Sequence, residues 1–68
     1  MRVKLQSLRQ ARGYTQQTFS DIIGISRNHY SQIETGDKNP SLKLAIKIKD
    51  GLNYHNDDIF ENTTTIRR

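Results

Sequence analysis

The sequence predicts an all-α fold, a compact bundle of four to five helices that contains a helix-turn-helix. Apolar residues recur every three or four positions in several segments, which is the periodicity of a helix with one buried face. No segment alternates apolar and polar residues as a half-buried strand does. The chain has 68 residues, which is enough for one domain with one hydrophobic core.

The first two helices are predicted from their ends. Residues 3–12 form the first helix, and Gly13 ends it, because glycine readily adopts the left-handed conformation that follows many helices. Thr15 is a suitable N-cap for the second helix. Gly24 then allows the chain to leave this helix in a sharp turn. The apolar residues of the second helix are Phe19, Ile22 and Ile23.

The third and fourth helices are predicted from their N-caps. Ser26 caps the third helix, which ends near Gly36. Residues 37–40 form a loop, because they combine Asp, Asn and Pro. Ser41 then caps the fourth helix, which continues to about residue 52. Its apolar side chains form one broad arc, made of Leu42, Leu44, Ala45, Ile46, Ile48 and Leu52.

The C-terminal part divides into a short final helix and a tail. A last turn begins at Asn56 or Asp57 and carries Ile59 and Phe60. Residues 61–68 are polar and rich in Thr, so we expect a flexible tail. The predicted division is therefore a helix-turn-helix domain over residues 1–60 and a flexible polar tail over residues 61–68.

Charge and composition narrow the classes of function. Residues 1–49 contain nine basic and three acidic side chains, whereas residues 50–68 contain two basic and four acidic ones. The basic part fits a polyanionic partner, although a net charge of +4 is also ordinary for a small domain. There is no cysteine, and the two histidines are far apart, so we expect no metal and no cofactor. We expect no membrane segment and no secretion signal, and hence a cytoplasmic protein in a bacterial cell.

The third helix has two chemically different faces. Tyr30 and Ile33 fall on one face, which suits the core. The opposite face carries Arg27, Asn28, Ser31 and Gln32. Any surface helix has a polar outer face, but this one lacks the Lys and Glu that usually provide it. Arginine can pair with guanine, and asparagine or glutamine with adenine, so this face suits the DNA major groove.

The chain resembles the Cro and phage-repressor-type helix-turn-helix family, often called the Xre family, over residues 5–60. The resemblance is carried by Gln16, IGISR at 23–27, YSQIE at 30–34, Gly36, NPSL at 39–42 and DDIF at 57–60. It implies a bundle of the lambda-repressor-like type. It also implies base reading by Arg27, Asn28 and Gln32, with Ser31 as a fourth. The implied phosphate contacts are Gln16, Ser26, Thr35, Lys38 and Asn39.

Three further features are open to two interpretations. Ser26 caps its helix, contacts the DNA backbone, or does both. Lys43 lies in the first turn of the fourth helix, where a cation opposes the helix dipole, so it either faces a phosphate or extends into water. The resemblance implies a salt bridge between Arg9 and Glu34 that supports the third helix. The alternative is that Arg9 and Glu34 are two separate charges in contact with water. Gly51 occupies a helix position where the family prefers alanine.

The expected function is sequence-specific regulation of transcription, most plainly as a repressor that binds double-stranded operator DNA. We expect a homodimer that pairs through the C-terminal region and associates with the nucleoid when bound to DNA. The alternative is an antitoxin or anti-repressor in which the same fold binds a protein partner. An enzyme is the poorest interpretation, because no nucleophile, base and acid are spaced for catalysis.

Overall fold

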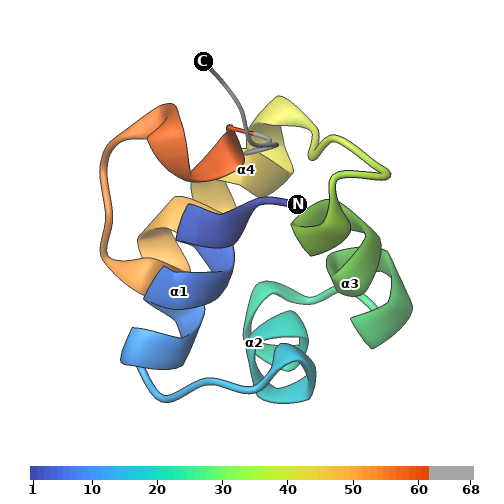
Figure 1. The fold of residues 1–68 in the computed structure, drawn as a ribbon. Helices are drawn as coiled ribbons and strands as arrows, with labels where there is room; N and C mark the ends of the chain where they lie inside the picture. The colour runs from blue at the N-terminus through green and yellow to red at the C-terminus, as the bar shows by residue number, and fades with distance from the viewer. Residues whose placement is uncertain (62–68) are drawn as a thin grey trace.

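The computed structural model describes residues 1–61, and these form four α-helices and one short 3-10 helix (Figure 1). The elements are α1 (Val3–Ala11), α2 (Gln16–Ile23), α3 (Arg27–Thr35), α4 (Leu42–Leu52) and η1 (Asp57–Phe60). The all-α prediction is confirmed, and α1 ends one residue earlier than expected. Residues 62–68 of the predicted tail lie outside the described residues. No helix in residues 1–61 is long and apolar enough to span a membrane.

The helices begin where the predicted caps stand. The hydroxyl groups of Thr15, Ser26 and Ser41 each accept a hydrogen bond from the backbone N–H three residues later, at 3.0 to 3.2 Å. Such a cap satisfies one of the free N–H groups of the first turn and contributes about 1 kcal/mol. Gly24 follows α2 with a φ of 81°, in the left-handed region, and turns the chain into α3.

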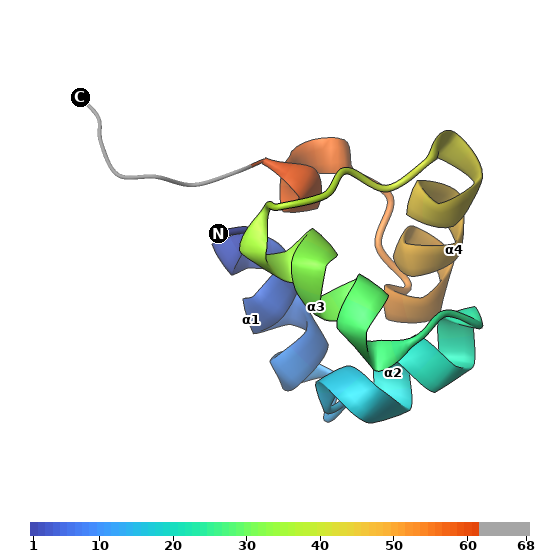
Figure 2. The same ribbon diagram turned by 90° about the vertical axis from the view of Figure 1, so that its right-hand side faces the viewer.

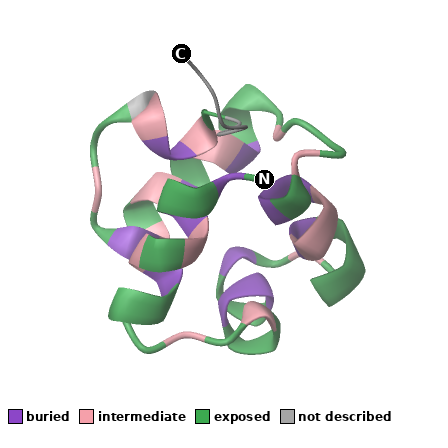
Figure 3. Ribbon diagram, in the orientation of Figure 1, coloured by how far each residue is buried: buried purple, intermediate pink, exposed green. Residues whose placement is uncertain are grey.

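One hydrophobic core fills the space between the helices. Buried residues face inward from every element, and the outer surfaces of the helices are exposed (Figure 3). The ring of Phe19 lies at the centre, with its centroid 5.4 Å from the rings of both Tyr14 and Tyr30. The buried core comprises Leu5, Phe19, Ile23, Tyr30, Ile33, Leu44, Ile48, Leu52 and Ile59.

Only part of the broad apolar arc predicted for α4 faces the core. Only Leu44, Ile48 and Leu52 of that helix are buried. Leu42 is 80% exposed and Ile46 is 47% exposed. At about 100° per residue, these two lie about 120° and 160° around the helix from the centre of the buried stripe. Ile22 of α2 is likewise exposed.

Candidate nucleic-acid interface

Helix α3 has one face buried and one face open. Tyr30, Ile33 and Glu34 pack against the bundle, whereas Arg27 and Asn28 are exposed. In Figure 2 the helix crosses the front of the molecule, with α2 below it and the loop that leads to α4 above it. The open face of α3 is therefore framed by two segments that carry three of the six predicted phosphate contacts, Gln16 in α2 and Lys38 and Asn39 in the loop.

The four side chains predicted to read bases form one patch on the outer side of α3. Arg27 and Asn28 are exposed in the first turn, and Ser31 and Gln32 are half-buried in the next turn. Positions four apart in a helix are neighbours, so the two pairs are contiguous. Their side chains make no hydrogen bond to another described residue. Their polar groups are thus open to an external partner.

The structure brings Gln16 and Arg27 together. Both line a hollow of about 580 Å³ between the end of α1 and the starts of α2 and α3. The amide Nε2 of Gln16 donates to Oε1 of Glu34 at 3.0 Å. Because an amide nitrogen carries two hydrogens, one N–H of Gln16 remains for a phosphate.

Two other predicted phosphate contacts already have partners inside the protein. The Ser26 hydroxyl accepts from the N–H of His29 at 3.1 Å and keeps its own proton free to donate. The Thr35 hydroxyl lies 3.0 Å from the carbonyl oxygen of Gln32 and 3.1 Å from Oδ2 of Asp37. Both are acceptors, so the single proton of Thr35 is engaged, and Thr35 would have to rotate before it could donate to a phosphate.

The loop after α3 places Lys38 and Asn39 at the surface. Both residues are exposed. Oδ1 of Asn39 accepts from Nη2 of Arg2 at 2.6 Å, which leaves the amide hydrogens of Asn39 for another partner. Arg2 is only 3% exposed, and we did not predict its involvement from the sequence. No local pattern marks it, because a single arginine near an N-terminus is typical of a solvated charge.

Lys43 lies apart from the Gln16 hollow. It is exposed in the first turn of α4 and lines a different hollow of about 270 Å³, between the end of α2 and the start of α4. Ser41 and Lys47 line the same hollow. The structure therefore places Lys43 with Lys47 near the turn that follows α2, rather than beside Gln16.

A buried ion pair supports α3 from behind. Nε of Arg9 donates to Oε2 of Glu34 at 2.6 Å, and Nη2 of Arg9 lies 3.4 Å from Oε1. Nη1 of Arg9 also donates to the carbonyl oxygen of Tyr14 at 2.7 Å. With Gln16 bonded to the same carboxylate, Glu34 joins α1, α2 and α3 at one point.

The charges of this pair hold each other in the ionised state. Burial by itself raises the pKa of Glu34, but the hydrogen bonds from Arg9 and Gln16 outweigh it and hold that pKa below its ordinary value. Burial lowers the pKa of Arg9, and Glu34 more than reverses the effect. Burial and the nearby carboxylate raise the pKa of Tyr30. The Tyr30 hydroxyl has no hydrogen-bond partner among the described residues.

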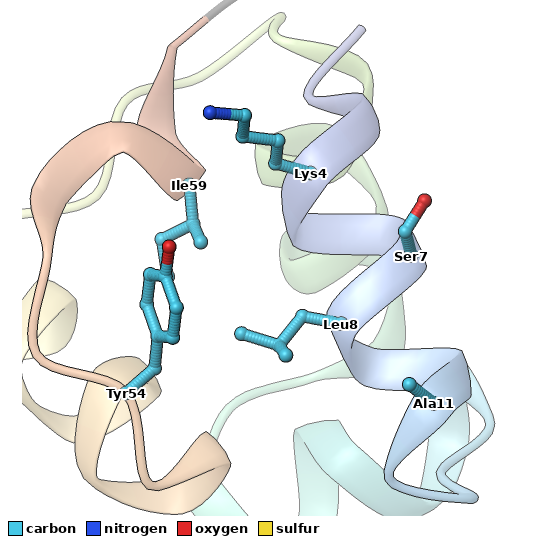
Figure 4. Close-up of a pocket in the computed structure, with 6 residues that line it drawn as sticks. All are labelled: Lys4, Ser7, Leu8, Ala11, Tyr54 and Ile59. Atoms are coloured by element: carbon cyan, nitrogen blue, oxygen red, sulfur yellow. The ribbon is translucent and has the colours of Figure 1, made fainter.

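The C-terminal segment packs against α1. Ile59 is 1% exposed, and Leu8, Tyr54 and Ile59 point toward one another across a groove of about 280 Å³ (Figure 4). Lys4 pairs with Asp58 at 2.9 Å above this groove. Ile59 therefore belongs to the core and is not available to a protein partner.

Comparisons with known proteins agree with this geometry. A family model described as "Helix-turn-helix" matches residues 5–58. An uncharacterized HTH-type transcriptional regulator of Bacillus subtilis (strain 168) is 37% identical over 60 residues, covering 88% of this chain and 91% of the relative. An SPbeta prophage-derived uncharacterized HTH-type transcriptional regulator of the same strain is 33% identical, covering 88% of this chain and 56% of the relative.

The similarity extends to archaea. An uncharacterized HTH-type transcriptional regulator of Methanocaldococcus jannaschii is 38% identical over 60 residues, covering 88% of this chain and 91% of the relative. No solved structure matches the chain significantly. The matched region begins inside α1, spans α2, α3 and α4, and ends inside η1.

Proposed function

The chain belongs to the helix-turn-helix family of DNA-binding transcriptional regulators, and we propose that it is a sequence-specific repressor that binds operator DNA with α3 in the major groove. The observation that carries this proposal is the outer face of α3. The side chains of Arg27, Asn28 and Gln32 make no hydrogen bond there to any other residue that the structure describes, while Glu34 holds the opposite side of the same helix to α1 and α2. We assign no catalytic role to the chain.

The base-reading and phosphate-binding residues have separate tasks. Arg27, Asn28, Ser31 and Gln32 read base edges, because their donors and acceptors match those that base pairs display in the major groove. The phosphate contacts fix the register of α3 on the duplex but carry no sequence information. This set comprises Gln16, Ser26, Thr35, Lys38, Asn39 and Lys43.

The proposed active form is a dimer on two half-sites. A single domain of this size contacts too few bases for strong specificity, so two copies would bind about one helical turn (~34 Å) apart. Residues 1–60 would form the DNA-binding unit of each copy. The pairing surface would lie in the C-terminal region, where Phe60 is half-buried and His55, Asn56 and Glu61 are exposed.

A protein-binding role, as in an antitoxin or anti-repressor, is the second candidate. Its interface would not include Ile59, because that side chain is buried. The observation that favours it is the outer side of α4, where Leu42 and Ile46 are exposed one turn apart. Binding at this apolar surface would respond little to salt, whereas DNA binding would weaken steeply.

Selection from a random pool of DNA duplexes tests the proposal. The purified protein is incubated with the pool at moderate salt, and the bound fraction is sequenced. We expect an enriched inverted repeat, which would define the half-site and show a dimeric reader. General salt-sensitive binding without enrichment would contradict sequence-specific recognition and would favour the protein-binding role.

A further inference from the structure

The side chain of Arg2 joins three segments that are distant in the sequence. Nε donates to the carbonyl oxygen of Phe60 at 2.9 Å, and Nη2 donates to Oδ1 of Asn39 at 2.6 Å. Nη1 donates to the carbonyl oxygen of Lys38 at 3.0 Å and also to that of Ile33. Figures 1 and 2 both show the N-terminus beside the last turn of α3. Arg2 thus links the end of α3, the following loop and η1.

This arrangement suits an arginine and no other side chain. The guanidinium is planar, always charged and carries five N–H groups, so one side chain can serve four acceptors. The acceptors are three backbone carbonyls and one side-chain amide, and none is a carboxylate. The cation also lies at the C-terminal end of α3, where the helix dipole favours positive charge. Arg2 is therefore bound by neutral oxygen acceptors rather than by an opposite charge.

The loop residues that Arg2 holds are those proposed to contact phosphate. Arg2 binds the carbonyl oxygen of Lys38 and the side-chain oxygen of Asn39 from the inside. The Lys38 side chain and the Asn39 amide hydrogens remain on the outside, because both residues are exposed. Without Arg2 the loop would have to become ordered when DNA binds, and that ordering opposes binding.

We propose that Arg2 is a positioning residue for DNA binding, which fixes the loop of Lys38 and Asn39 in the conformation that contacts the phosphate backbone. The inference rests on the proposed function. It assigns Arg2 no contact with bases, so Arg2 should affect all DNA sequences equally.

A double-mutant cycle tests this role. The unmodified protein, Arg2→Ala, Lys38→Ala and the double variant are titrated with a random-sequence duplex about two helical turns long, at about 50 to 200 mM salt. In the unmodified background, Lys38→Ala should weaken binding about fivefold and reduce the salt slope by about one. In the Arg2→Ala background, the same change should cost less than about twofold, because the two residues act through one loop.

Arg12 offers a matched control. Its Nε donates to the carbonyl oxygen of Leu52 at 2.9 Å, so it also joins distant segments, but away from the loop. Arg12→Ala removes the same charge and should leave the full cost of Lys38→Ala. Arg2→Lys keeps the charge but cannot serve four acceptors, so it should behave as Arg2→Ala does. If Arg2→Ala does not fold, Arg2→Lys replaces it in the cycle.

Hydrogen exchange of the free protein gives an independent readout. The N–H of Lys38 donates to the carbonyl oxygen of Gln32 at 3.2 Å, and it should exchange faster in Arg2→Lys while amides of the core remain protected. Equal costs of Lys38→Ala in both backgrounds, or unchanged exchange at Lys38, would overturn the inference alone. Failure of the unmodified protein to bind any duplex in a salt-dependent way would overturn the proposed function, and the inference with it.

Discussion

Glu34 is the residue on which the position of α3 depends. Its carboxylate accepts hydrogen bonds from Arg9 of α1 and Gln16 of α2. A buried ion pair contributes little net stability, because desolvation of the charges opposes their attraction. Its geometry is directional, however, and it fixes α3 against two other helices. Gln16 donates a hydrogen bond to Glu34 and is also a proposed phosphate contact.

The Glu34 pair should make the protein sensitive to acid. The pKa of Glu34 in the folded protein lies below its ordinary value of 4.5, so its stabilising contribution is complete above that pH. The contribution is lost as the pH falls through the folded-state pKa. Urea unfolding of the unmodified protein between neutral and acid pH should therefore show a fall in the free energy of unfolding below the ordinary pKa.

Glu34→Gln should be less stable at neutral pH by about 3–5 kcal/mol, because Arg9 loses its buried partner. Its free energy of unfolding should also change less with acid. Asp58→Asn is the control, since Asp58 pairs with an exposed Lys4 and solvent screens such a pair, so this change should affect the free energy of unfolding little. An unchanged acid profile in Glu34→Gln would show that other carboxylates cause the acid sensitivity.

Arg27 should determine one base position in each half-site. Arg27→Ala should cost about 1–3 kcal/mol in binding to the selected operator and relax the preference at that position. Arg27→Lys keeps the positive charge but loses the two-pronged contact with guanine, so it should retain general affinity and lose the preference. Sequencing of DNA selected by each variant measures both effects. An unchanged consensus in Arg27→Ala would refute the assigned reading face.

Helix α4 illustrates how packing, more than sequence pattern, decides which apolar residues are buried. Leu44, Ile48 and Leu52 lie on the stripe that faces α2 and the core. Leu42 and Ile46 are as apolar, but no described element covers their side of the helix. Gly51 lies on the packed side, because a Cβ built there would be 3.0 Å from Cε1 of Phe19. The missing side chain at residue 51 thus makes room for the central ring of the core.

Gly51→Ala should therefore destabilise the protein, although alanine favours a helix by about 1 kcal/mol. Phe19 lies between the rings of Tyr14 and Tyr30 and has little room to move away from a new Cβ. Overpacking of this kind costs about 1–3 kcal/mol, so we expect a net loss of about 1 kcal/mol in thermal unfolding. Ser7→Ala on the exposed side of α1 should instead be neutral or slightly stabilising. A rise in Tm for Gly51→Ala would contradict the crowding at Phe19.

For the whole molecule, small size and uneven charge favour cooperation between two copies. One core of nine buried apolar side chains gives a small domain a marginal stability, which a bound partner would increase by mass action. Residues 1–49 carry most of the basic side chains and contain the entire helix-turn-helix. Long-range attraction between these charges and the phosphates would orient this part of the protein toward DNA. Two copies bound to one operator would double both the phosphate contacts and the bases read.

The spacing of the two half-sites should be critical. Insertion of about five base pairs between them turns one half-site to the opposite side of the duplex. Binding to the altered operator should then fall to the affinity of a single half-site, and insertion of about ten base pairs should restore part of it. Gel-shift titrations of the three duplexes measure the change. Equal affinity for all three would exclude a dimer that binds both half-sites together.

The helices can be predicted from the amino-acid sequence alone, because the signals that start and stop a helix are local. The caps Thr15, Ser26 and Ser41 act on N–H groups three residues away, and Gly24 sets its own φ. The burial of Tyr30 and Ile33 also followed from their spacing on one face. The base-reading and phosphate roles stay predictions, since they rest on the resemblance and on the open face of α3.

The contacts between segments that are distant in the sequence can be seen only in the folded protein. Arg2 reaches four acceptors up to 58 residues away, and no pattern in the sequence distinguishes it from a solvated arginine. The same holds for Gln16, whose bond to Glu34 spans two helices, and for Leu42, which is apolar but exposed. The periodicity of the sequence indicates which apolar or charged residues share a face of one element. Burial and pairing depend on which other element packs beside it, and that is settled only when the whole chain has folded.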